Sequence, residues 1–260
     1  AIMGAFSVAS VAGVPLGLWL ARHGGFRTPF FVVAGLGLLI LAFTFVVLPP
    51  LRSHLQQLVP ARSLTEILRR PVVRLALTTI AVSNMATFAI VPSMAPYLIR
   101  NCGMRRTDLE YMYALGGACT FVSMRIVGWL VDRYGAARVM VLASLFLSGV
   151  LVTGFLPEHN LLPITIVFVG FLISVSSRNV CVNATCSRVA APSERARYQS
   201  LQSAVQHMAS AVGAALGPIF LHELADGRLG GIAPLSVLSI VLTLALPTLM
   251  YRIYRLGELH

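Results

Sequence analysis

The sequence contains no lysine and very little acid. All 20 of its basic residues are arginine, it has only 9 aspartates and glutamates, and 11% of its residues are charged. A soluble domain usually carries about a quarter charged residues, so this chain has too little polar surface to cover a water-soluble fold. The composition is 57% hydrophobic, with a mean hydropathy of +0.82. The scarcity of charge therefore excludes an ordinary soluble protein.

Apolar stretches of about 20 residues recur along almost the whole chain, and each is long enough to cross a ~30 Å hydrocarbon core. Because lipid offers no hydrogen-bond partner to the backbone, such spans must be helices. We predict an all-α, polytopic membrane protein with eight transmembrane helices. The predicted spans are residues 1–21, 28–50, 72–98, 109–131, 137–157, 160–184, 199–222 and 232–254.

The arginines lie mostly between the spans, and they are unevenly divided between the two sides. Segments 51–74, 132–138, 185–198 and 252–260 hold twelve of them, whereas the alternate segments hold six. Arginine accumulates in cytoplasmic loops, so we place the first set and the C-terminus in the cytoplasm. The net charge of +11 then reflects topology and lipid contacts, and we expect no nucleic-acid partner.

Sequence patterns of metal and enzyme sites are missing as well. The four cysteines show no metal-binding spacing, and "HELAD" at 222–226 lacks the second histidine of a zinc-protease motif. No phosphate-binding loop and no nucleophile constellation occur in the sequence. We expect no cofactor, no metal and no enzymatic activity.

The stretch "RIVGWLVDRYGAAR", residues 125–138, concentrates charge and glycine where the fourth span ends. Gly128 would let a neighbouring helix approach closely. Asp132 could accept hydrogen bonds from a helix N-terminus or pair with an arginine. Gly135 permits a backbone conformation that bulkier residues resist, while Arg133 and Arg138 would stay at the headgroups. We expect a signature turn with a gating role.

This pattern resembles the signature loop of the major facilitator superfamily, G-x-x-x-D-R-x-G followed by basic residues. In that family the loop lies between helices 2 and 3 and again between helices 8 and 9. Here Ala136 and Ala137 stand where basic residues are usual. Four spans follow the turn, so the resemblance implies helices 5–12 of a twelve-helix, two-bundle transporter, with the first four helices upstream and needed for function.

The same resemblance implies a domain organisation. Residues 1–50 would form the last two helices of the N-terminal bundle, 51–71 a cytoplasmic central linker, and 72–260 the C-terminal six-helix bundle. The first span carries "SVASVAGVPLGLWLA", with Gly13, Pro15 and Gly17. This is similar to the helix-5 antiporter motif of drug and sugar efflux members. An ordinary helix interface made of small residues would give the same pattern.

Polar residues at membrane depth usually face a cavity or a partner. These residues form the candidate substrate path: Asn84, Arg125, Arg178, Asn179, Asn183, Gln202, Gln206 and His207. Arg178 is expected in the transport path or its inner gate, the alternative being a pair with Glu194. Arg125 is expected to be structural. A stripe from Gln202 to Gly217 could be a packing face or a ligand site.

No aspartate or glutamate lies deep within any predicted span. Proton coupling would need a titratable group, which His207 or a carboxylate in the upstream helices could supply. We therefore predict a secondary active transporter of a small molecule in the plasma membrane, in a bacterium the inner membrane. Proton-coupled efflux of drugs, sugars or metabolites is favoured. Alternatives are a sugar or organic-acid importer or uniporter, and a receptor or scaffold that does not transport.

Overall fold

A computed structural model describes residues 13, 16–17, 19–47, 64–157, 162–191 and 194–257. Their fold is helical apart from one small hairpin. The helices are α2 (Thr28–Val47), α3 (Leu64–Arg69), α4 (Pro71–Arg100), α5 (Arg106–Tyr134), α6 (Ala136–Phe155), α7 (Ile164–Cys186), α8 (Arg195–Phe220) and α9 (Ile232–Gly257). The hairpin strands are β1 (His222–Glu223) and β2 (Leu229–Gly230).

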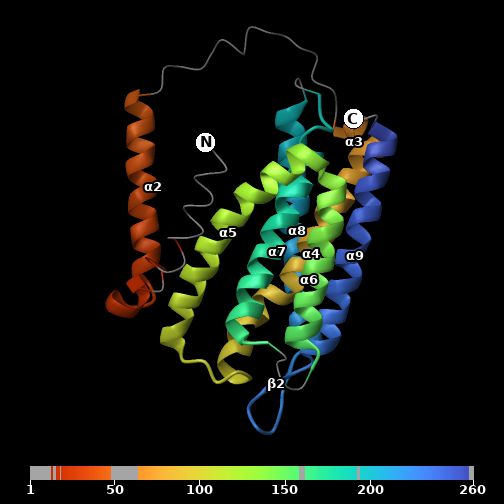
Figure 1. Cartoon of the computed structure of the whole chain (residues 1–260). Helices are drawn as coiled ribbons and strands as arrows, with labels where there is room; N and C mark the ends of the chain where they lie inside the picture. The colour runs from red at the N-terminus through yellow and green to blue at the C-terminus, as the bar shows by residue number, and fades with distance from the viewer. Residues whose placement is uncertain are drawn as a thin grey trace.

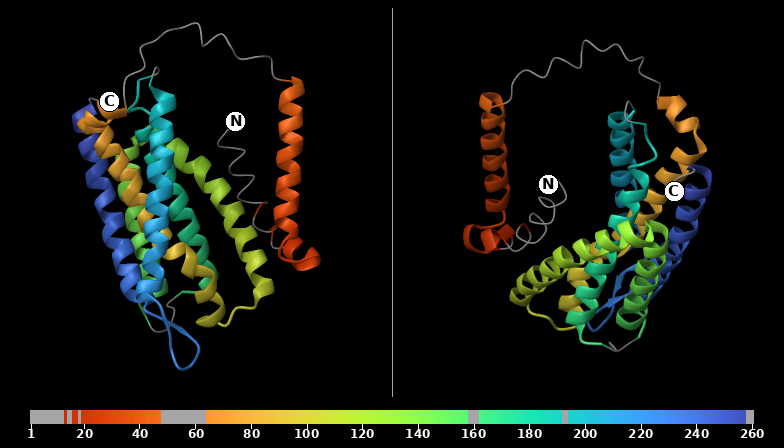
Figure 2. Two further views of the ribbon diagram at one scale, coloured as in Figure 1. Left: turned by 180° about the vertical axis from the view of Figure 1, so that it is seen from behind. Right: turned by 45° about the horizontal axis from the view of Figure 1, so that its top comes forward.

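Helices α4 to α9 form one bundle, and α2 stands apart from it (Figure 1). Within the bundle α4 packs against α8 and α9, α7 packs against α5 and α6, and α6 also packs against α9. No residue of α2 is buried. In every view α9 lies on the side of the bundle away from α2, whereas α5 leans toward it (Figure 2). This arrangement separates the chain into a first part and a six-helix bundle.

The bundle is held together by two apolar clusters, one toward each end of the helices. One contains Val73, Met140 and Met250, and the other contains Leu98 and Phe155. These side chains come from α4, α6 and α9, so each cluster joins helices that lie far apart in the sequence. In lipid such close packing, more than the expulsion of water, drives the association of helices.

The hydropathy-based spans agree with the helices in part. Six helices of the described residues are long and apolar enough to cross a membrane: α2, α4, α5, α6, α7 and α9. Helix α8 is also long, with 26 residues, but its charged and amide side chains keep it outside that set. The first predicted span lies largely outside the described residues. The protein is therefore a multi-pass helical membrane protein.

The connection between α8 and α9 contains the hairpin, which the sequence analysis did not predict. His222 pairs with Gly230 and Glu223 with Leu229 in an antiparallel register. The amide of Asn101, at the end of α4, donates to the Leu229 carbonyl at 3.0 Å and accepts from the Leu229 N–H at 2.9 Å. These bonds tie this connection to the end of α4.

Candidate functional site

A polar groove lies between the ends of α7 and α8 that the arginine distribution assigns to the cytoplasm. Its volume is about 460 Å³. Its lining residues are Val180, Asn183, Ala184 and Ser187 from α7 and the residue after it, and Gln199, Gln202, Ser203 and Gln206 from α8. None of these eight residues is charged. The groove thus presents amides and hydroxyls on an otherwise apolar bundle.

Helical periodicity explains why these amides meet. Gln199, Gln202 and Gln206 are three and four residues apart, so they share one face of α8. Asn183 lies four residues before Ser187 and faces them from α7. None of the four groove amides makes a hydrogen bond to another described residue. Their donors and acceptors are therefore available to a ligand or to water.

The stripe from Gln202 to Gly217 divides into two halves with different surroundings. Gln202 and Gln206 line the groove, whereas Gly213 and Gly217 are buried. A Cβ atom at Gly213 would come within 2.7 Å of the Met85 carbonyl oxygen, so α8 touches the backbone of α4 there. The half of the stripe with Gln202 and Gln206 therefore lines a groove, as a ligand site would. The half with Gly213 and Gly217 packs against α4, as a packing face would.

Arg178 does not line the groove. Its side chain is fully buried and donates to the hydroxyl oxygens of Thr243 at 2.8 Å and Thr87 at 2.7 Å. It thereby connects α7 to α9 and α4. Each residue of a helix turns the side chain by about 100°, so Arg178 points into the bundle while its neighbour Asn179 is exposed.

The alternative pairing of Arg178 with Glu194 is wrong. Glu194 accepts from the guanidinium of Arg70 at 2.8 and 3.1 Å, a partly buried bidentate pair. This pair joins the residue between α3 and α4 to the N-cap of α8. It fixes the end of α8 that carries the groove glutamines.

The other candidate residues lie elsewhere in the bundle. Asn84 donates to the Ile80 carbonyl of its own helix at 2.8 Å. Arg125 is exposed on α5, and among the described residues it has no hydrogen bond or ion pair. Asn179 and His207 are exposed but do not line the groove. Of the predicted substrate path, the structure brings together Asn183, Gln202 and Gln206.

Three polar groove residues were missing from the sequence prediction: Ser187, Gln199 and Ser203. The three-residue step from Gln199 to Gln202 was a usable signal. The predicted stripe began at Gln202 and did not include it. Ser187 follows the last residue of α7. Because helical periodicity ends there, the sequence does not indicate which way the Ser187 side chain points.

The signature turn is a single glycine between two helices. Gly135 has φ +84°, ends α5 and begins α6, so the expected backbone conformation is confirmed. The guanidinium of Arg133 lies 5.3 Å from the ring centre of Trp129 and 5.7 Å from that of Tyr134. An arginine over an aromatic face is attracted by the ring, which fixes Arg133 near its own helix.

Two expectations for this turn differ from the structure. Asp132 is exposed, and within the described ranges it makes no hydrogen bond or ion pair. A Cβ atom at Gly128 would meet no described atom within 4 Å, so the close helix contact is not observed there. Both residues lie on α5, the helix that leans toward α2 (Figure 2).

The antiporter-like motif falls at the edge of what the structure describes. Pro15 lies outside the described residues. Gly13 and Gly17 have no described atom within 4 Å of a Cβ position. The expected tight packing at these two glycines is therefore not seen among the described residues.

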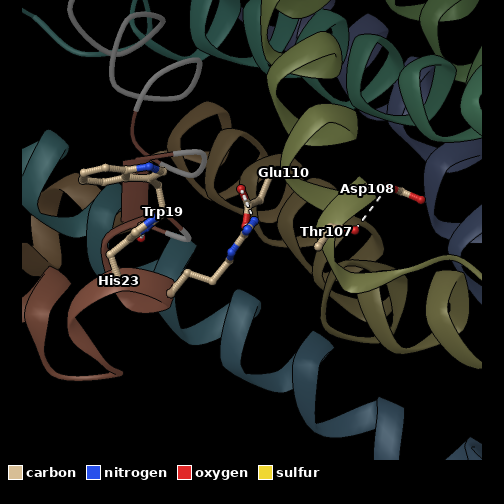
Figure 3. A network of polar contacts seen from close by, with 6 residues as sticks. Trp19, His23, Thr107, Asp108 and Glu110 are labelled. Atoms are coloured by element: carbon tan, nitrogen blue, oxygen red, sulfur yellow. Dashed lines mark hydrogen bonds and ion pairs between the residues drawn. The ribbon is translucent and has the colours of Figure 1, made fainter.

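An ion pair connects the first part of the chain to the bundle, at the end opposite the signature turn. The guanidinium of Arg22 lies 3.3 Å from a carboxylate oxygen of Glu110 in α5 (Figure 3). Next to it the rings of Trp19 and His23 lie 4.6 Å apart, and the His23 Nδ1 is 2.9 Å from the Trp19 carbonyl oxygen. By the arginine distribution this contact is at the outer face of the membrane.

Comparison with known proteins agrees with this architecture. The chain is 28% identical over 256 residues to a chloramphenicol resistance protein of Streptomyces lividans, covering 92% of the chain and 60% of the relative. It is 20% identical over 242 residues to the uncharacterized MFS-type transporter YbcL of Bacillus subtilis, covering 93% and 61%. It is 23% identical over 133 residues to the putative transporter AraJ of Escherichia coli, covering 51% and 33%.

The chain thus spans about 60% of the length of the Streptomyces lividans and Bacillus subtilis relatives. The family model described as Major Facilitator Superfamily matches residues 1–213 and 76–253. The resemblance that the signature turn indicated is therefore confirmed over nearly the whole chain. This chain belongs to the Major Facilitator Superfamily of membrane transporters.

Proposed function

We propose that this chain supplies helices 5–12 of a twelve-helix transporter that exports a small polar molecule across the plasma membrane. In this proposal α4 to α9 are the second bundle, and the residues before 51 belong to the first. Transport proceeds by alternating access, in which two bundles rock about a site between them. In a bacterium the membrane is the inner membrane.

The observation that carries the proposal is the groove between α7 and α8. Polar side chains on membrane helices usually face a cavity or a partner, and four amide side chains gather at this end of α7 and α8 without a hydrogen-bond partner among the described residues. A ligand with hydroxyl and amide groups would satisfy them. Because none of the lining residues carries a charge, an uncharged ligand suits the groove better than an anion or a cation.

Chloramphenicol is the first compound to test, because one relative is a chloramphenicol resistance protein and the molecule is uncharged with hydroxyl and amide groups. The antiporter-like motif at Gly13, Pro15 and Gly17 supports the outward direction. Coupling to protons would use His207 on α8 or a carboxylate of the upstream helices. The lining residues themselves contain no group that titrates near neutral pH.

The test is efflux of chloramphenicol by cells that express the full-length protein. A hydrogen bond to a neutral ligand contributes about 0.5–1.5 kcal/mol, so Gln202→Leu and Gln206→Leu should each weaken apparent affinity by about two- to tenfold. Asn84→Ala is the matched control, because that amide bonds to its own helix. Normal efflux by the double glutamine variant would contradict the assignment of the groove.

A further inference from the structure

A second groove lies between α6 and α9, on the face of the bundle away from α2 (Figures 1 and 2). Its volume is about 550 Å³, in the range of small-ligand sites. The groove is lined by Ala137, Arg138, Val141, Pro247, Thr248, Tyr251, Arg252 and Arg255. The proposed transport path does not use any of these residues, and its substrate groove lies between other helices.

Three guanidinium groups from two helices converge on this groove without a counter-ion. Arg138, Arg252 and Arg255 are exposed, and none of them forms an ion pair with a described residue. The lining contains no carboxylate. Arg255 lies 4.8 Å from the ring centre of Tyr251, which orients one guanidinium over the groove.

The start of α6 adds to the positive potential. Helix α6 begins at Ala136, has no acidic residue in its first turn and has no side-chain cap. Its first N–H groups and the positive end of its dipole therefore lie next to Arg138. Farther along the two helices from the cytoplasmic end, the groove is lined by the apolar residues Val141 of α6 and Pro247 of α9.

We propose that this groove binds one anionic diacyl phospholipid. The arginines lie at the end of the bundle assigned to the cytoplasm, where the headgroups of the inner leaflet are found, and would contact the lipid phosphate. One acyl chain would then lie against Val141 and Pro247. Because α6 and α9 both contribute, the lipid would brace two helices on the outside of the bundle, and it would not enter the transport path.

General attraction of arginine to an anionic leaflet would act at any exposed position on this side. At a specific site, by contrast, lipid binding should fall only when the arginines that line the groove are removed. Arg252 and Arg255 line the groove, whereas Arg188, in the connection between α7 and α8, is exposed on the same side but does not line it. Arg188→Gln is therefore the matched control for loss of charge.

The experiment measures phosphatidylglycerol retained by the purified full-length protein, by native mass spectrometry, with phosphatidylcholine as the zwitterionic comparison. Each lost arginine contact should weaken binding about fivefold. The double variant Arg252→Gln/Arg255→Gln should therefore weaken phosphatidylglycerol binding about 25-fold, while Arg188→Gln should retain it. Phosphatidylcholine should bind weakly to all three proteins.

Four results would overturn the proposal. A fivefold loss in Arg188→Gln, the same loss per arginine as in the double variant, would show general charge attraction. Unchanged binding by the double variant, or equal binding of phosphatidylcholine, would show that no headgroup site exists. Displacement of the lipid by millimolar inorganic phosphate would assign the groove to a soluble anion. Elution volume and melting temperature of each variant show whether it folds.

Discussion

Replacing Arg178 tests whether this buried charge stabilises the bundle or acts on substrate. Arg178→Ala removes the hydrogen bonds to Thr87 and Thr243 and leaves a cavity between α4, α7 and α9. A hydrogen bond to a charged donor contributes about 1.5–3 kcal/mol, so two of them contribute roughly 3–6 kcal/mol. Thr87 also donates to the Ser83 carbonyl and keeps that bond in the variant. We therefore expect the loss of stability to be nearer about 3 than about 6 kcal/mol.

The assay is thermal unfolding of the full-length protein in detergent, with transport per folded molecule measured beside it. A loss of about 3 kcal/mol lowers the melting temperature of a domain of this size by roughly 6–12 °C. Arg178→Met should recover much of that loss, because an apolar side chain of similar length can replace a buried charge at little cost. Asn179→Ala, the exposed neighbour, should leave the melting temperature unchanged.

The reasoning would be refuted by a variant that keeps its stability but loses transport. If Arg178→Ala melted at the original temperature but no longer transported, the side chain would act on substrate or on the change between states. The buried position of Arg178 would then belong to one conformation of the transport cycle, and the bonds to Thr87 and Thr243 would be replaceable.

Three further predictions follow from single contacts. Gly213→Ala should lower the melting temperature, because its Cβ would come within 2.7 Å of a backbone oxygen of α4, whereas Gly128→Ala, with no described atom within 4 Å, should not. Gly135→Val should cost about 1–3 kcal/mol, because a backbone at φ +84° and ψ 145° is adopted almost only by glycine, and the cost is measured as reduced stability to heat; an unchanged melting temperature would mean that the turn relaxes. Arg22→Glu and Glu110→Arg should each lower the melting temperature, and the double swap should restore it. Because the pair is partly exposed and such pairs contribute up to about 1 kcal/mol, each loss should be small, and a double swap that restores none of it would contradict the contact.

Much of the fold could be predicted from hydropathy alone. The spans predicted for α4 to α7 and α9 coincide with helices to within a few residues. The short turn at Gly135 followed from its flanking spans and its position in the signature. Helix α8 was also predicted as a span from its apolar residues, and the structure has a 26-residue helix there, although its hydropathy leaves it outside the six helices apolar enough to cross a membrane.

The orientation of single side chains could not be predicted in the same way. One residue of a helix turns the direction by about 100°, and the sequence does not state which face meets the neighbouring helices. Arg178 and Asn183 were therefore grouped together, although the first enters the bundle and the second lines the groove. The partner of Glu194 was missed because Arg70 is 124 residues away in sequence.

The central claim, that the α7–α8 groove holds the transported molecule, is tested most directly by thiol protection at Gln202→Cys. The measurement uses the full-length protein without its native cysteines, in inverted membrane vesicles whose cytoplasmic face meets the reagent. We predict that Gln202→Cys reacts and that chloramphenicol slows the reaction, whereas Ser200→Cys, exposed at the same end of α8 but outside the groove, reacts at a rate that chloramphenicol does not change. A transporting variant whose cysteine at 202 reacts equally fast with and without the substrate would contradict the claim.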